Sequence, residues 1–252
     1  AGTLAAATVL TAGSGCTPFE LSDRLAAELG LAAVPAPWHT NRLPVTSVGD
    51  ALASLTDAAG KIASDVLFLS RPEVAELAEP RAAGRGGSSA MPQKQNPVLS
   101  VLVRSAALQA PGQAAQLHLA AANFNDERPD GAWHAEWSTL RELLRLALGA
   151  ASTARALTAG LVVDHAAVER TLALSGGMLV AERLAIALAP HLGDDRARAL
   201  LGRATDAADL ERLLRAEPAL AEVDIAALLD PGAYLGATGI MIDRVLDGGQ
   251  PR

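Results

Sequence analysis

Apolar residues recur along this chain at alternating spacings of three and four, which is the pattern of an α-helix with one buried face. The first such stripe consists of Leu52, Leu55, Ala59, Ile62, Val66 and Leu69. We therefore predict a long helix of a helical bundle in this part of the chain.

A second stripe repeats about every 3.5 residues, which is a heptad pattern. It consists of Leu140, Leu143, Ala147, Ala150, Ala154, Leu157 and Leu161. The small alanine side chains on this seam allow a neighbouring helix to approach closely. Residues 98 to about 122 form a third predicted helix. We expect Pro111 and Gly112 to kink or break it, because proline lacks the N–H of the helical hydrogen bond.

The last third of the chain has a different sequence pattern. Shorter amphipathic pieces are separated there by the turn signals "SGG", "GDD", "DPG" and "DGG". We therefore predict two domains: residues 1–163 as part of a central helical bundle that carries a loop at 84–97, and residues 164–252 as a smaller C-terminal helical domain.

Composition agrees with an all-α fold. Half of the residues are apolar, only 3 % are aromatic, and alanine and leucine dominate over the strand-forming residues. The formal net charge is −7, and no Lys/Arg cluster is long enough to follow a phosphate backbone. We therefore expect no nucleic-acid partner.

Cysteine content and hydropathy narrow the expected location. Cys16 is the only cysteine, which excludes an internal disulfide and a thiolate metal cluster and fits a reducing cytoplasm. No run of about eighteen apolar residues is present, so we expect no membrane partner. The chain begins "AGTLAAATVLTAG", without Met and without a basic n-region. We therefore expect Ala1 to be an internal position of a longer protein.

The stretch "GRGGSSAMPQKQNPVLS", residues 84–100, interrupts the helices. Its three glycines give the backbone the freedom expected of a lid that opens and closes. Asn96 is a good N-cap and Pro97 suits a first helical turn, so we predict that the next helix begins here. The N-terminal amides of that helix, with the ammonium of Lys94, would then form a site for a carboxylate.

Ser88 and Ser89 would lie beside that carboxylate. A hydroxyl there can exchange a proton with the adjacent carbon if the dianionic intermediate and the serine alkoxide are stabilised by Lys94 and the amides. The alternative is that the loop only joins two helices, with Lys94 in solvent, because serine and glycine are the usual residues of loops. These residues by themselves leave both interpretations open.

Two further polar clusters are candidates for function. In "PWHTNR", Arg42 can pair with a substrate carboxylate or form a salt bridge between helices, and His39 lies beside it. The segment "NDERPDGAWHAEW" contains Glu127, Arg128, Trp133, His134 and Glu136. We expect Arg128 and Glu136 to order the entry to the next helix and Trp133 to pack. His134 and Glu136 point apart at a spacing of two on a helix, so they make no metal site.

The sequence "GGSSAMPQKQNP" resembles the signature of the fumarase/aspartase superfamily, Gly-Ser-Ser-x-Met-Pro-x-Lys-x-Asn-Pro, at every fixed position from Gly87 to Pro97. The segments "PWHTNR", "GKIASDV", "EVAELAEP" and "NDERPDGAWHAEW" resemble the 3-carboxy-cis,cis-muconate cycloisomerase branch. The resemblance implies that Ser88 is the catalytic proton-transferring group on a mobile loop. It also implies a substrate-binding set of Ser89, Met91, Lys94, Asn96, Arg42 and His39.

The same resemblance implies a long-helix bundle, a small polycarboxylate substrate, no metal or organic cofactor, and a cytoplasmic homotetramer whose active sites each draw on three subunits. The implied reaction is lactonisation of 3-carboxy-cis,cis-muconate to 4-carboxymuconolactone in protocatechuate breakdown, the β-ketoadipate pathway of aromatic compound catabolism. The alternatives are a sister lyase that eliminates an amine or nitrite from a substituted succinate to give fumarate, or a truncated subunit that only assembles.

Two departures from the family pattern limit what can be transferred. The family's first two motif regions, one of which supplies an active-site histidine, lie in an N-terminal half that this sequence lacks. We therefore expect the isolated chain of 252 residues to be inactive. In addition, Leu43 follows Arg42 where the family usually has an acid, which leaves the exact substrate open.

Overall fold

The structure is a computed structural model, and it describes residues 2–91, 94–125 and 129–248. Within these residues the α-helices are α1 (Gly2–Leu10), α2 (Pro18–Glu28), α3 (Leu43–Leu69), α4 (Val98–Ala122), α5 (Gly131–Ala159), α6 (His165–Ala173), α7 (Ala181–Leu192), α8 (Asp194–Leu201), α9 (Ala207–Arg215), α10 (Ile225–Leu229) and α11 (Thr238–Leu246). Short 3₁₀ turns lie at Met178–Val180, Pro218–Leu220 and Pro231–Tyr234. The described strands, β1 (Leu77–Ala78) and β2 (Val162–Val163), pair with each other. The all-α prediction is therefore confirmed.

The chain divides into two compact units. The first consists of residues 1–70 and 78–162, and the second of residues 71–77 and 163–252. The turn signals predict a single boundary after residue 163, which places segment 71–77 in the first part. The structure instead assigns this segment to the second unit. Whether either unit is an independent domain stays a prediction.

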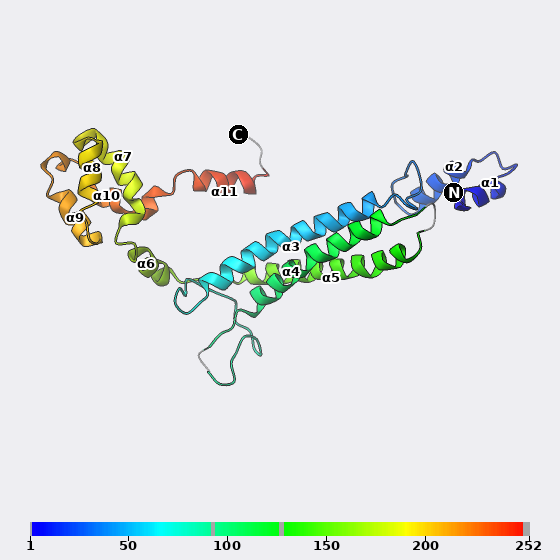
Figure 1. Cartoon of the computed structure of the whole chain (residues 1–252), viewed down its shortest axis with the longest axis horizontal. Coiled ribbons are helices and arrows are strands. Elements are labelled where there is room, and N and C mark those ends of the chain that lie inside the picture. The colour runs from blue at the N-terminus through cyan, green and yellow to red at the C-terminus, as the bar shows by residue number, and fades with distance from the viewer. Residues whose placement is uncertain (1, 92–93, 126–128, 249–252) are drawn as a thin grey trace. The chain divides into compact units, whose positions relative to one another are not determined.

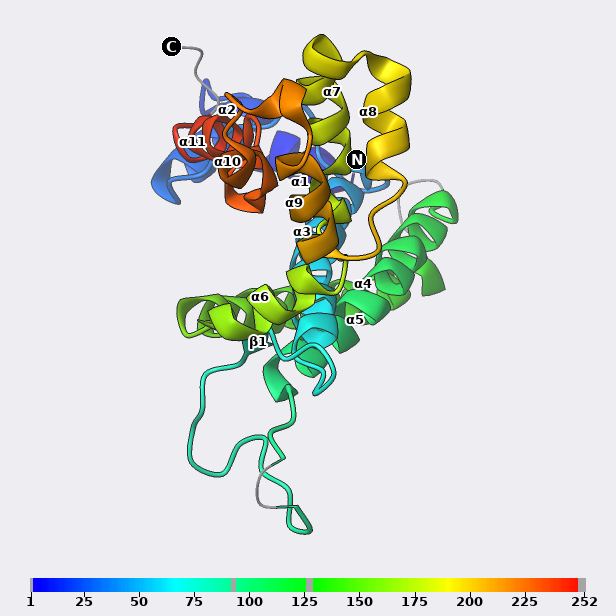
Figure 2. The same cartoon turned by 90° about the vertical axis from the view of Figure 1, so that its left-hand side faces the viewer.

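The first unit is built on a bundle of α3, α4 and α5, which lie side by side along their length in Figure 1. Figure 2 shows the same three helices from a direction turned by 90°. Ala59 and Val66 are buried, as the stripe on α3 predicts. Leu55 and Ile62 are instead exposed, at 44 % and 42 %. The buried face of α3 consists mainly of small residues, because α4 packs close to it. A Cβ added at Gly60 would lie only 2.5 Å from the Cβ of Ala107 on α4.

Of the kink or break predicted at Pro111 and Gly112, the break is wrong, and the kink stays a prediction. α4 runs from Val98 to Ala122 with Pro111 inside it. Pro111 and Gly112 are exposed, whereas Ala110 and Ala114 beside them are buried in the bundle. Packing on both sides of the proline therefore offsets the lost helical hydrogen bond.

The heptad seam on α5 is largely buried. Leu143, Ala147, Ala150 and Leu157 are at most 2 % exposed, and Leu140 and Ala154 are half-buried. Leu161 lies beyond the end of the helix at Ala159, so the seam is one position shorter than predicted.

The second unit has its own apolar core. Its fully buried leucines are Leu184, Leu188, Leu210 and Leu214. Among the described residues no single helix has the length and apolar character that crossing a bilayer requires. The helical segments His165–Ala173 and Met178–Leu192 reach that length and apolar character only when taken together, and they are bent by 77° relative to each other.

Candidate functional site

The signature loop leaves the bundle where α3 ends and α4 begins (Figure 1). Its neck is closed by Asn96, whose backbone N–H and side-chain amide both donate to the carbonyl of Gly86, at 2.7 and 3.2 Å. Gly87 and Gln95 form an antiparallel bridge next to this contact. Gly86 has a φ of +75°, and a Cβ there would lie 2.7 Å from the carbonyl oxygen of Asn96. Glycine at position 86 is therefore required by both backbone conformation and space.

The tip of the loop carries the predicted catalytic residues. The hydroxyl of Ser88, which is half-buried, accepts a hydrogen bond of 3.2 Å from the N–H of Met91. Ser89, Met91 and Lys94 are exposed. The N–H of Lys94 donates to the carbonyl of Met91 at 2.9 Å, and its ammonium forms no ion pair with any described residue. The turn at Met91 thus holds Ser88 and Lys94 in one short segment, without a direct hydrogen bond between them among the described residues.

The start of α4 differs from the prediction. The N-cap is Pro97, and the described residues show no capping hydrogen bond from Asn96, whose side-chain NH₂ donates to Gly86. The capping group is the carboxylate of Glu79: Oε2 accepts from the N–H of Leu99 at 3.0 Å, and Oε1 accepts from the N–H and the hydroxyl of Ser100, both at 2.7 Å. The predicted carboxylate site at these amides is therefore wrong, since the protein's own carboxylate occupies them.

Glu79 is the residue that sequence reasoning misses. It lies twenty residues before its partner Leu99, outside the range of the usual capping patterns. The only signal is its place in "EVAELAEP", directly before a proline at the start of the loop.

Arg42 lies at the opposite end of the bundle, in a nearly buried ion pair. Its Nε and Nη2 donate to the two carboxylate oxygens of Glu136, at 2.7 and 2.6 Å, and Nη1 donates to the carbonyl of Trp38 at 2.7 Å. The side chain of Glu136 is only 4 % exposed. This is the salt-bridge alternative of the sequence analysis. Arg128, which with Glu136 is predicted to order the entry to α5, lies outside the described residues.

His39 is half-buried at the same end. With Leu21, Leu25 and Pro37 it lines a cavity of about 400 Å³ in the first unit. α3 separates this end from the loop, and its 27 residues span about 40 Å at 1.5 Å per residue. The predicted site residues therefore fall into two groups that one chain does not bring together: His39 and Arg42 at one end, and residues 88–96 at the other.

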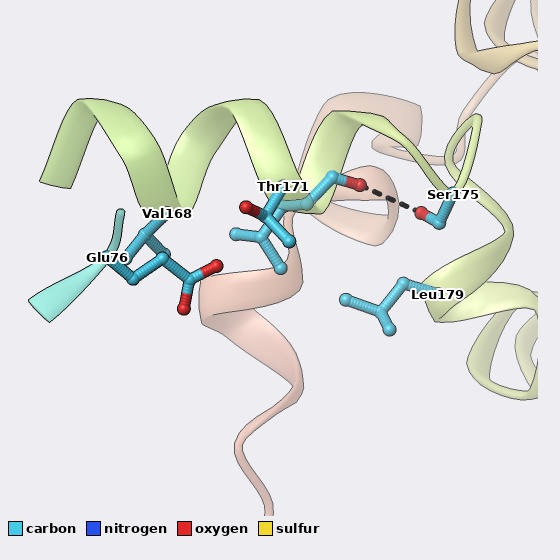
Figure 3. Close-up of a pocket in the computed structure, with 6 residues that line it drawn as sticks. Glu76, Val168, Thr171, Ser175 and Leu179 are labelled. Carbon is cyan, nitrogen blue, oxygen red and sulfur yellow. Dashed lines mark hydrogen bonds between the residues drawn. The ribbon is translucent and has the colours of Figure 1, made fainter. Parts of the chain in front are cut away.

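A smaller cavity of about 230 Å³ lies in the second unit (Figure 3). Glu76, Val168, Thr171, Leu172, Ser175 and Leu179 line it. The hydroxyl of Ser175 donates to the carbonyl of Leu172 at 2.9 Å. None of the predicted site residues lines this cavity, so it is separate from the candidate site.

Comparison with known proteins gives a consistent family. Residues 1–112 match the model of the lyase family. The chain is 50 % identical over 242 residues to a nitrosuccinate lyase of Streptomyces davaonensis, covering 91 % of this chain and 51 % of that protein. It is 40 % identical over 256 residues to a 3-carboxy-cis,cis-muconate cycloisomerase of Bradyrhizobium diazoefficiens, covering 98 % of this chain and 55 % of that protein.

Solved structures agree with this result. The 3-carboxy-cis,cis-muconate lactonizing enzyme of Pseudomonas putida matches with a TM-score of 0.82 and 37 % identity, over 94 % of this chain and 55 % of that one. A fumarate lyase of Mesorhizobium sp. BNC1 matches with a TM-score of 0.77 and 31 % identity, over 93 % and 54 %. The chain spans about half the length of the curated relatives it matches. Together the sequence and structural matches support the assignment of this chain to the fumarase/aspartase superfamily, whose all-α fold it has.

Proposed function

We propose that the complete protein in which this chain occurs eliminates nitrite from nitrosuccinate and releases fumarate. The observation that carries the proposal is the 50 % identity to a nitrosuccinate lyase over 91 % of the chain, against 40 % to a cycloisomerase over 98 %. This reverses the order favoured by the short sequence segments.

In the proposed reaction Ser88, as the alkoxide, removes a proton from C3 of nitrosuccinate, the carbon next to the C4 carboxylate. The electron pair moves into that carboxylate and gives a dianionic, enolate-like intermediate. The pair then returns to form the C2–C3 double bond, while the C2–N bond breaks and nitrite leaves with its bonding electrons. The net change is nitrosuccinate to fumarate, nitrite and one proton.

The loop supplies the groups that this reaction needs. The N–H of Met91 donates to the hydroxyl oxygen of Ser88, and it would stabilise the negative charge of an alkoxide there. Because Glu79 fills the amides of Leu99 and Ser100, the substrate carboxylate needs a different partner. The exposed ammonium of Lys94 is that group in the proposal, and Asn96, which the family resemblance also implies as a substrate ligand, lies two residues further along the chain.

The proposed site is composite. His39 lies at the other end of α3 from Ser88, so it serves a loop that belongs to another copy of the protein. A homotetramer, which the family resemblance implies, provides such an arrangement.

The second candidate is lactonisation of 3-carboxy-cis,cis-muconate. The TM-score of 0.82 to a lactonizing enzyme and the 40 % identity to a cycloisomerase favour it. In this reaction a substrate carboxylate oxygen adds to the double bond, and the hydroxyl of Ser88 gives its proton to the adjacent carbon. The same loop residues serve both reactions.

The test is to supply the complete protein with each substrate. With nitrosuccinate, we expect fumarate and nitrite in equal amounts, followed by ultraviolet absorbance and by a colorimetric nitrite assay. The Ser88→Ala variant is the control for spontaneous loss of nitrite. Loss of the diene absorbance of 3-carboxy-cis,cis-muconate with no release of nitrite would replace the lyase by the cycloisomerase. Activity on neither substrate would overturn both the lyase and the cycloisomerase proposals.

A further inference from the structure

Residues Glu79 and Pro80, which we call the loop stem, fasten the signature loop to the bundle at two points. Glu79 holds the first turn of α4 through the three hydrogen bonds to Leu99 and Ser100. Pro80 packs on Gly160 at the end of α5, where an added Cβ would lie 2.5 Å from the Cβ of Pro80. The stem is therefore fixed on the ends of two bundle helices.

The stem also connects to the neck of the loop. The side chain of Arg85 donates a hydrogen bond to the carbonyl of Pro80. The next residue, Gly86, accepts both hydrogen bonds from Asn96. A continuous set of contacts thus leads from the helix ends, through the stem, to the neck from which the tip with Ser88 and Lys94 extends.

We propose that Glu79 is a positioning residue for the reaction. Its carboxylate fixes the stem on α4 and thereby sets where the loop presents Ser88 and Lys94 to the substrate. This inference rests on the proposed role of Ser88 in proton transfer. Glu79 itself acts through the loop and touches neither the substrate nor the reacting atoms.

The contact requires a carboxylate. All three groups that face Glu79 are donors, and they use both of its oxygens. A glutamine would turn its NH₂ toward one of these donors, which would then lose its acceptor. The negative charge also suits the N-terminus of α4, where the helix dipole is positive. Ser100 is fully buried, so its hydroxyl has no solvent to replace the lost partner.

The first experiment uses Glu79→Gln in the complete protein. We expect kcat to fall by about ten- to a hundredfold, because small displacements of a reacting group have effects of that size, while KM changes less. We also expect trypsin to cleave faster after Arg81, Arg85 and Lys94 in the absence of substrate, with the sites identified by mass spectrometry.

Three further variants separate positioning from general stability. Asp206→Ala removes a carboxylate that caps α9 in the other unit by accepting from the N–H of Asp209 at 2.8 Å. It should lower the melting temperature without changing kcat or cleavage of the loop. Ser100→Ala removes one of the three donors to Glu79 and should give a smaller change in the same direction as Glu79→Gln. Gly160→Ala should displace Pro80 and reproduce the effect by an independent route.

Loop cleavage is measured without substrate, so it tests the stem even if the complete protein acts on neither proposed substrate. If Glu79→Gln does not fold, Ser100→Ala and Gly160→Ala decide the question by the same measurements. Unchanged cleavage and unchanged kcat in the folded variants would overturn the proposal. An equal loss of kcat in Asp206→Ala would also overturn it, because the effect would then belong to helix capping in general.

Discussion

Glu136 shows at the scale of a single residue how a polar cluster can be structural. Its carboxylate is almost completely buried in the bundle, and both of its oxygens accept hydrogen bonds from Arg42. The guanidinium of Arg42 also lies 5.3 Å from the centre of the Phe124 ring. The guanidinium of Arg42 therefore directs its paired N–H donors to a residue of the same chain. Its sequence context also allows a role in substrate binding.

The first prediction concerns this ion pair. Arg42→Ala should lower the free energy of unfolding by about 3–5 kcal/mol, because it leaves a buried carboxylate without its partner. Urea denaturation of the chain measures this. Arg145→Ala is the matched control: its pair with Glu142 is exposed, so the loss should be below about 1 kcal/mol. Unchanged stability of Arg42→Ala together with a raised KM would instead identify Arg42 as a substrate ligand.

The second prediction concerns the serine pair in the complete protein. Ser88→Ala should lower kcat by about two to four powers of ten, as is typical of a general acid-base group, with little change in stability. Ser89→Ala should have a smaller effect. Ser88 is half-buried and is oriented by the N–H of Met91, whereas Ser89 is exposed. Small and equal effects of the two substitutions on kcat would indicate that the loop only joins two helices.

At the scale of an element, periodicity predicts which segments are helical better than it predicts which residues are buried. The segment from residue 98 to about 122 is α4, and Ala59 and Val66 are buried as predicted. Leu55 and Ile62 are exposed because the inner face of α3 is set by close contacts with α4, which lies far away in the sequence. No local pattern contains that information.

Glycines in the helices are another limit of sequence reasoning. Gly60 lowers the helix propensity of α3, yet the structure places it at a close contact between helices. Gly149 lowers the propensity of α5 in the same way but has no atom within 4 Å of an added Cβ. The sequence cannot distinguish these two glycines, because the difference lies in the neighbouring helix.

The third prediction uses this pair. Gly60→Ala should destabilise the chain by about 1–3 kcal/mol, because the new methyl group meets the Cβ of Ala107, which cannot rotate away. Gly149→Ala should stabilise it by about 0.5–1 kcal/mol through helix propensity alone. The two effects are measured by urea denaturation. Stabilisation by both substitutions would show that α3 and α4 do not pack as closely as described.

At the scale of the whole molecule, each helix of the bundle keeps large apolar side chains exposed in a single chain. Leu55, Ile62, Val101, Leu108 and Leu148 are all more than 40 % exposed. Because large exposed apolar patches mark association sites, we expect these side chains to be covered by another chain. The candidate site is also divided between the two ends of α3.

The fourth prediction follows for the isolated chain of residues 1–252. As a monomer it should show no turnover of nitrosuccinate or 3-carboxy-cis,cis-muconate, because Ser88 and His39 do not meet within one chain. It should also associate in solution, as measured by light scattering. Full activity in a preparation shown by light scattering to be monomeric would contradict both the composite site and the need for a partner.

The sequence motif identifies the proposed reacting loop, but it cannot say which copy of the protein provides the rest of the site. Ser88, Lys94 and Asn96 all lie within the short signature segment, so local spacing is enough to group them. His39 is separated from them by the length of α3, about 40 Å, and its grouping with a loop depends on contacts between chains. Because α3 is this long, a site that contains both His39 and the loop requires two copies of the protein.

The fifth prediction tests this separation by mixing two inactive variants of the complete protein, Ser88→Ala and His39→Ala. If each site takes its loop from one subunit and its histidine from another, random reassembly of an equal mixture leaves about a quarter of the sites with both groups intact. Activity should then return to about a quarter of the wild-type value after the subunits are dissociated and reassociated together. Reassembly of each variant alone is the control and should stay inactive. If the mixture also stays inactive although mixed oligomers form, the two groups act within one chain or His39 lies outside the site. If His39→Ala is fully active by itself, the histidine has no part in the reaction, and the composite site would have to be built from other residues.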